Sequence, residues 1–137
     1  MSGSLLDVNA LVALAWDSHV HHAAIRNWFS RNSKQGWATC PITENGFVRV
    51  SSNPKVLPSP IGVETARSVL LALRATDGHH FVTDDVSITD ADVPRMLGHR
   101  QITDADLLTL ARGFRLLTFD TALVKLAQNQ DVELLSI

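Results

Sequence analysis

The sequence has only one cysteine, Cys40, among its 137 residues. A single thiol cannot form a disulfide within the chain, so a disulfide framework and a cysteine-rich zinc site are both excluded. The sequence also lacks a signal peptide and any apolar run long enough to span a bilayer. The apolar stretch near its start, residues 4–15, is interrupted by Asp7 and Asn9. We therefore expect a soluble, cytoplasmic protein without a membrane partner.

The sequence also lacks an excess of positive charge and a glycine-rich phosphate loop. The formal net charge is −2, which gives no basic footprint for nucleic acid. It does not exclude a nucleic-acid substrate, because acidic residues around a metal ion are offset by the charge of the ion. No glycine-rich loop follows the first apolar segment, residues 4–8. This argues against an enzyme that binds a nucleotide cofactor.

The sequence does contain apolar segments with strand character that alternate with amphipathic segments. The expected strands are residues 4–8, 37–40, 80–83, 115–119 and 132–137. The expected helices are residues 10–16, 19–31, 42–51, 63–75, 103–112 and 121–128, with a loop and a short helix over 84–97. No linker divides the chain, so we expect one domain over residues 1–137. The alternation predicts an α/β fold, with helices on both faces of a mainly parallel central sheet.

Four carboxylates stand at the boundaries of these predicted elements. Asp7 and Asp120 follow strands, whereas Glu44 and Asp104 lie in the first turns of helices. Such positions converge on the crevice outside the carboxyl ends of a parallel sheet. Grouped carboxylates stay ionised together when a cation joins them, and their oxygens suit Mg²⁺ or Mn²⁺. Any one acid could simply cap a helix, but four in this order favour a shared site.

Four short motifs contain these acids. They are Leu6-Asp7-Val8-Asn9, Thr43-Glu44-Asn45-Gly46-Phe47, Thr103-Asp104-Ala105-Asp106-Leu107 and Thr118-Phe119-Asp120. In this order they resemble the motifs of PIN-domain nucleases, and most closely the toxin ribonucleases of bacterial VapBC toxin–antitoxin pairs. The resemblance covers essentially the whole chain, and residues 40–50 and 98–104 match a subgroup of those toxins. It implies a PIN-like three-layer α/β/α sandwich.

The resemblance also implies a metal-dependent endoribonuclease that hydrolyses phosphodiester bonds of structured RNA, either transfer RNA or ribosomal RNA. By this similarity Asp7, Asp104 and Asp120 hold Mg²⁺ or Mn²⁺, directly or through water, and Glu44 completes the catalytic site through a water. The ion would lower the pKa of a bound water, which then attacks the phosphorus. Whether one ion or two is bound stays open.

Several neighbouring residues have supporting roles in this interpretation. Thr118 would orient an acid or a water by its hydroxyl, and Asn9 would support Asp7. Arg49 and Arg100 lie close in sequence to the acidic motifs and are candidate RNA contacts, with a structural ion pair as the alternative for each. Asp106 departs from similar toxins, which often carry a larger neutral residue there. Since residues i and i+2 of a helix point to different sides, we expect Asp106 to be peripheral.

The remaining polar residues are interpreted as structural. Asp84 and Asp85 follow a predicted strand, and we expect a helix cap rather than a ligand role. The six histidines are expected at helix starts or on the surface rather than around zinc: His19, His21, His22, His79, His80 and His99.

The sequence also suggests protein partners and alternative functions. The family resemblance implies a homodimer, inhibited by a cognate VapB-type antitoxin, with residues 10–16 and 19–29 as candidate docking surfaces. A PIN-like nuclease of RNA processing and a non-catalytic binding module are the alternatives. A phosphoacceptor signalling domain is weaker, because Leu6 precedes Asp7 where paired acids would be needed.

Overall fold

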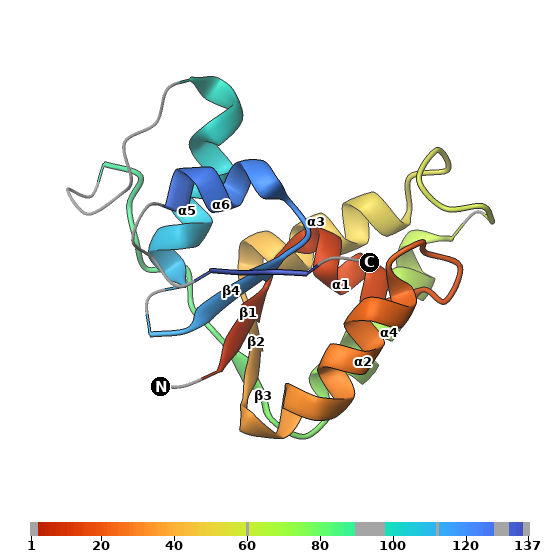
Figure 1. Ribbon diagram of the computed structural model, residues 1–137. Coiled ribbons are helices and arrows are strands. Elements are labelled where there is room, and N and C mark those ends of the chain that lie inside the picture. Colours follow the sequence, from red (N-terminus) through yellow and green to blue (C-terminus); the bar gives the residue numbers. More distant parts are fainter. Residues whose placement is uncertain (1–2, 60, 90–97, 112, 128–131, 136–137) are drawn as a thin grey trace.

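Five parallel strands form one sheet in the computed structural model, which describes residues 3–59, 61–89, 98–111, 113–127 and 132–135. The strands are β1 (Ser4–Leu6), β2 (Trp37–Thr39), β3 (His79–Phe81), β4 (Arg115–Thr118) and β5 (Val132–Leu134). Their order is β3-β2-β1-β4-β5, with β1 at the centre (Figure 1). Each neighbouring pair is parallel, so the carboxyl ends of all five strands lie along one edge.

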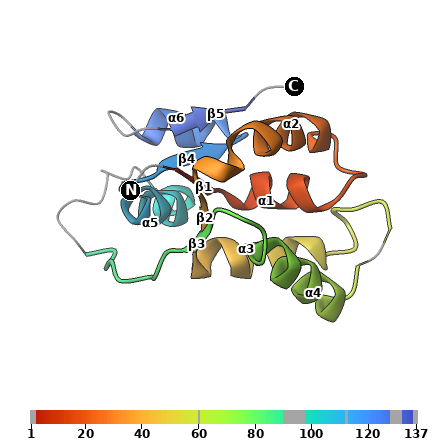
Figure 2. The same cartoon turned by 90° about the horizontal axis from the view of Figure 1, so that it is seen from below.

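Helices cover both faces of this sheet. They are α1 (Val8–Ala15), α2 (His22–Asn32), α3 (Pro41–Ser51), α4 (Val63–Arg74), α5 (Ile102–Leu110) and α6 (Thr121–Ala127), with short 3₁₀ turns η1 (Ser33–Gln35) and η2 (His99–Gln101). The first four helices pack on one face, and α5 and α6 pack on the other (Figure 2). The predicted three-layer α/β/α sandwich is therefore confirmed. Among the described residues, no helix is long and apolar enough to cross a membrane.

Alternating side chains of the central strands supply the two cores. Leu5 and Leu116 belong to the core under α5 and α6, whereas Leu6 and Leu117 belong to the core under the first four helices. Successive residues of a strand point to opposite faces, and β1 and β4 pair in register, with Leu5 opposite Leu116. All four side chains have no solvent exposure, so the centre of the sheet is a rigid base for the residues that follow it.

The ends of several elements differ from the prediction. The first strand stops at Leu6 rather than at residue 8, because Asp7 caps α1 and Val8 already begins the helix. The second helix starts at His22 rather than at residue 19. The second strand stops at Thr39 rather than at residue 40, and α3 starts at Pro41 rather than at residue 42, since proline is well suited to the first turn of a helix. Residues 84–89 are irregular, and the rest of the predicted loop and short helix lies outside the described residues.

Candidate active site at the carboxyl edge of the sheet

Asp7 stands where the central strand changes into a helix. Its backbone N–H donates to the carbonyl oxygen of Leu117 at 2.9 Å, which continues the pairing of β1 with β4. One carboxylate oxygen, Oδ1, accepts from the backbone N–H of Val8 at 2.8 Å and caps α1. The other, Oδ2, accepts from the hydroxyl of Thr118 at 2.8 Å. The strand end and two hydrogen bonds thus hold a buried carboxylate in one orientation.

The hydroxyl of Thr118 links the other predicted supporting residue to the same acid. Its single proton goes to Asp7, so its oxygen accepts from the Asn9 side-chain amide at 3.3 Å and from the backbone N–H of Asp120 at 3.0 Å. The amide oxygen of Asn9 accepts from the backbone N–H of Phe119 at 3.1 Å. The structure therefore brings Asp7, Asn9, Thr118 and Asp120 together, although more than a hundred residues separate the two pairs.

Asp104, in the first turn of α5, belongs to the same electrostatic environment. Burial, followed by the charges of Asp7 and Asp120, raises the pKa of Asp104 to about 6. Burial also raises the pKa of Asp7, and Asp120 adds to that rise, while the hydrogen bonds from Thr118 and Val8 oppose it. Three carboxylates thus repel one another at one edge of the sheet.

This repulsion and the donor chemistry fit a hard divalent cation. The groups are carboxylates, which Mg²⁺ and Mn²⁺ prefer over nitrogen or sulfur ligands. A cation between them would offset the repulsion that adds to the effect of burial on the pKa of Asp104. Within the described part of the chain, no three such side chains lie close enough together to coordinate one metal ion. The three acids are therefore candidate ligands rather than a preformed cage.

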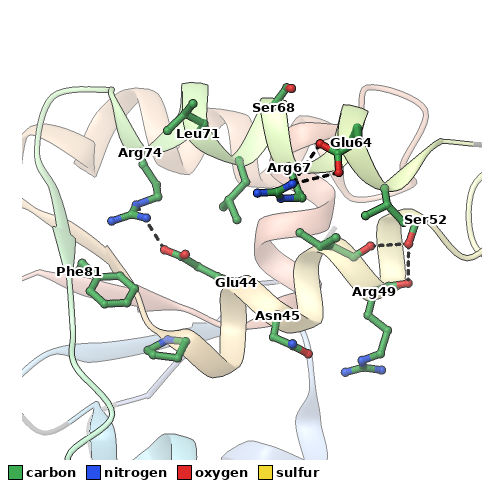
Figure 3. Close-up of a pocket in the computed structure, with 14 residues that line it drawn as sticks. Glu44, Asn45, Arg49, Ser52, Glu64, Arg67, Ser68, Leu71, Arg74 and Phe81 are labelled. Atoms are coloured by element: carbon green, nitrogen blue, oxygen red, sulfur yellow. Dashed lines mark hydrogen bonds and ion pairs between the residues drawn. The ribbon is translucent and has the colours of Figure 1, made fainter.

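Glu44 points into a neighbouring groove. Its Oε2 atom accepts from the hydroxyl of Thr39 at 2.7 Å and lies 3.4 Å from Nε of Arg74. In Figure 3 the carboxylate is directed toward Arg74 of α4. The structure thus gathers three of the predicted acids and pairs the fourth with a cation that the sequence analysis did not consider. Glu44 and Arg74 are 30 positions apart in the sequence, and no local pattern would have revealed this pair.

The other candidate residues have separate positions. Arg49 is exposed and lines the same groove as Glu44, whereas the side chain of Arg100 lies outside the described parts. Asp106 has a buried Oδ1 without a hydrogen-bond partner, and burial followed by the charge of Asp84 raises its pKa. Its electrostatic neighbour is therefore Asp84, which agrees with a peripheral position. No helix follows Asp85 within residues 86–89, so the predicted cap is not seen there.

His21 contacts the site through Phe119, which the sequence did not predict. Its ring stacks on Phe119, with centroids 4.3 Å apart and planes 13° from parallel. Phe119 stands between Thr118 and Asp120, so the stack helps to hold the turn that positions both. The position of Phe119 beside the last acid was the available signal, but the sequence does not show which residue covers that ring.

Comparisons with known proteins agree with this architecture. A model of the PIN domain matches residues 4–129. The chain is 66% identical to Ribonuclease VapC38 of Mycobacterium tuberculosis, over 98% of this chain and 99% of that protein. It is 45% identical to Ribonuclease VapC39 of the same organism, over 96% and 99%. The structure of VapBC2 from Rickettsia felis bound to a DNA fragment from their promoter has a TM-score of 0.64 and 13% identity, covering 99% of this chain and 100% of that chain.

Proposed function

Because the chain belongs to the PIN-domain family, in its VapC ribonuclease group, we propose that it is a Mg²⁺- or Mn²⁺-dependent endoribonuclease. It acts in the cytoplasm as the toxin of a toxin–antitoxin pair and cuts structured RNA, either transfer RNA or ribosomal RNA. The observation that carries this proposal is the convergence of Asp7, Asp104 and Asp120 at the carboxyl edge of the sheet, where burial and then the charges of Asp7 and Asp120 raise the pKa of Asp104. Carboxylates brought together in this way are suited to holding a divalent ion.

In this reaction the acids would hold a metal ion, and their polar neighbours would keep the acids in place. A bound divalent ion supplies a water of lowered pKa and neutralises charge on the phosphoryl oxygens. Asp7, Asp104 and Asp120 would hold the ion, and Glu44 would complete the site. Thr118 keeps the Asp7 carboxylate in place, and Asn9 ties Thr118 to the backbone of Phe119. The protein thus orients its ligands through hydrogen bonds.

An antitoxin and a second copy of the chain are the proposed protein partners. Support for the antitoxin comes from the related VapC ribonucleases and from the fold shared with VapBC2. Of the two helices predicted as docking surfaces, α1 is buried along Ala10–Ala13. The outer side of α2 is accessible and forms a groove with residues near β5, lined by Ala23, Ala24 and Leu135 among others. We therefore place the antitoxin on α2.

Cleavage of RNA by single acid variants tests the proposal. Asp7→Asn, Asp104→Asn and Asp120→Asn should each slow cleavage on the order of a hundredfold or more, because each removes one ligand of the ion. Circular dichroism should show an unchanged fold, and a chelator should silence the wild type. Asp17→Asn, in an exposed turn after α1, is the matched control and should cleave normally.

Two outcomes would contradict this function. RNA cleavage that continues in a chelator would remove the divalent ion from the mechanism. RNA binding without any cleavage, with or without divalent ions, would identify the alternative, a non-catalytic binding module on the same fold.

A further inference from the structure

A groove of about 860 Å³ runs between α3 and α4, and Phe81 of β3 is among the residues that line it. It begins at Glu44 in the first turn of α3 and continues to Arg49 in the last turn of that helix. The facing wall is the α4 surface that carries Arg67 and Arg74 (Figure 3). The groove therefore starts at the fourth acid of the proposed active site.

Three arginines and two glutamates give this groove a net positive lining. Arg67 forms an ion pair with Glu64 on the same helix, at 3.0 Å, with both side chains mostly exposed. Arg49 is exposed and makes no ion pair within the described part of the chain. Arg74 contacts Glu44. The whole chain carries a formal net charge of −2, so this concentration of guanidinium groups is a local feature that complements a polyanion.

The bond between Arg74 and Glu44 is the weaker of the two that Glu44 makes. The Nε–Oε2 distance is 3.4 Å, at the long end for an N–H···O hydrogen bond, and 39% of the Arg74 side chain is exposed. The guanidinium also lies 4.8 Å from the ring centre of Phe81, a cation–π contact that holds it in the part of the groove near Glu44. The Glu44 side chain is only 15% exposed, so the open side of this pair is Arg74, and a phosphate that reaches its guanidinium competes with one long contact.

Glu44 keeps a stronger partner if Arg74 leaves. Thr39 has one hydroxyl proton, which it donates to Glu44 at 2.7 Å. The 2.8 Å contact between Thr39 Oγ1 and His79 Nε2 must therefore be donated by the imidazole. Burial, followed by the charges of Arg74 and His80, lowers the pKa of His79 to about 4, so the ring is neutral at pH 7. The two hydrogen bonds of the chain His79–Thr39–Glu44 involve no atom of Arg74.

We propose that Arg74 binds a backbone phosphate of the RNA substrate. In the free protein, Glu44 holds the Arg74 guanidinium. When RNA enters the α3–α4 groove, the phosphate replaces Glu44 as the partner of Arg74. This inference rests on the proposed ribonuclease function. A guanidinium makes stronger, bidentate hydrogen bonds to a phosphate than the single long bond seen here. The same exchange leaves Glu44 without a cationic partner, at the carboxyl end of β2 beside the end of β1 that carries Asp7. Arg74 would thus be a positioning residue that couples RNA binding to the availability of the fourth acid.

RNA binding without cleavage tests the exchange. The parent protein carries Asp104→Asn and is kept in a chelator, and its affinity for a short fluorescein-labelled single-stranded RNA is measured by anisotropy over a range of salt concentrations. Arg74→Gln should weaken binding severalfold and reduce the slope of log affinity against log salt by about 0.7, the value for one phosphate contact on a single strand. Glu44→Gln should strengthen binding, because it releases Arg74. Arg26→Gln removes the same charge from exposed α2 and should change neither quantity.

Arg74→Gln should weaken RNA binding and Glu44→Gln should strengthen it, and a folding defect would not produce opposite changes in affinity. Equal salt slopes for Arg74→Gln and its parent would overturn the inference, even if Arg74→Gln lowered the melting temperature. The same holds if Arg74→Gln leaves RNA binding unchanged but weakens binding of the antitoxin, since the groove would then belong to a protein partner. Failure of the ribonuclease function is seen separately, as absence of RNA cleavage by the wild-type protein with Mg²⁺ or Mn²⁺.

Discussion

Single hydroxyl groups organise both halves of the site. Thr118 donates to Asp7 and accepts from Asn9 and the backbone of Asp120, and Thr39 links His79 to Glu44. Each threonine is the last residue of its strand and has no solvent exposure. A buried hydroxyl without partners is costly, so each one fixes the direction of an acid while satisfying its own hydrogen bonds.

The neutral imidazole of His79 predicts how stability depends on pH. Its pKa is lowered to about 4 from 6.5, by burial and then by Arg74 and His80. Below pH 6.5 the imidazole binds a proton in the unfolded chain but stays neutral in the folded chain. The residue therefore lowers the free energy of unfolding as the pH falls from 6.5 toward 4. The effect is absent above 6.5. Because His79 is only partly buried and solvent screens its neighbours, we expect a loss on the order of 1 kcal/mol or less.

Urea unfolding of wild type and His79→Gln at about pH 7.5 and about pH 5 measures this contribution. The wild type should lose more stability than the variant between the two values, since glutamine keeps a donor for Thr39 but does not titrate. An equal loss in the two proteins would show that His79 is not kept neutral by the fold.

At the scale of elements, the contact between α1 and α3 decides where two of the acids lie. Asp7 caps α1, and Glu44 lies in the first turn of α3. The helices approach so closely that a Cβ added at Gly46 would collide with Cγ2 of Val8. Gly46 is helical and buried, so its role is to leave space rather than to relax the backbone.

Gly46→Ala should therefore destabilise the protein despite the higher helix propensity of alanine. We expect a loss of about 1–3 kcal/mol, typical of overpacking in a core, together with reduced RNA cleavage because α1 and α3 are displaced. Thermal unfolding monitored by circular dichroism measures the first effect. Asn45→Ala, on the exposed side of the same turn, is the control and should be neutral or slightly stabilising. A more stable Gly46→Ala protein would show that the two helices separate at little cost.

At the scale of the whole molecule, the parallel topology assembles the acids. The β1–β4 pair places Asp7 beside residues 118–120, and α5 brings Asp104 within reach of both. The cluster forms at an edge of the sheet, where Asp104 and Asp120 are half-buried and Asp7 is buried. Toxicity in a cell should then depend on the cluster and not on the folded surface alone.

Expression of the chain by itself in a bacterium should stop growth, and Asp7→Ala should restore it, because the water would lose its activating ion. Growth curves and the integrity of total RNA measure both effects. Co-expression of the small protein encoded beside the chain should restore growth through occlusion of the site. Asp17→Ala is the control and should remain toxic. If Asp7→Ala were as toxic as the wild type, the harm would come from surface binding, and the nuclease explanation of toxicity would fail.

By itself, the sequence determined the α/β class, the sequence of elements and the family, because alternating strand and helix patterns and the short acidic motifs are local signals. Through the family resemblance it also assigned Asn9 to the support of Asp7, and Thr118 to the orientation of an acid or a water. Tertiary structure decided what each acid faces. The partners of Glu44 come from β2 and α4, and His21 meets Phe119 across most of the chain. Such contacts depend on which elements become neighbours after folding, and no local spacing encodes that.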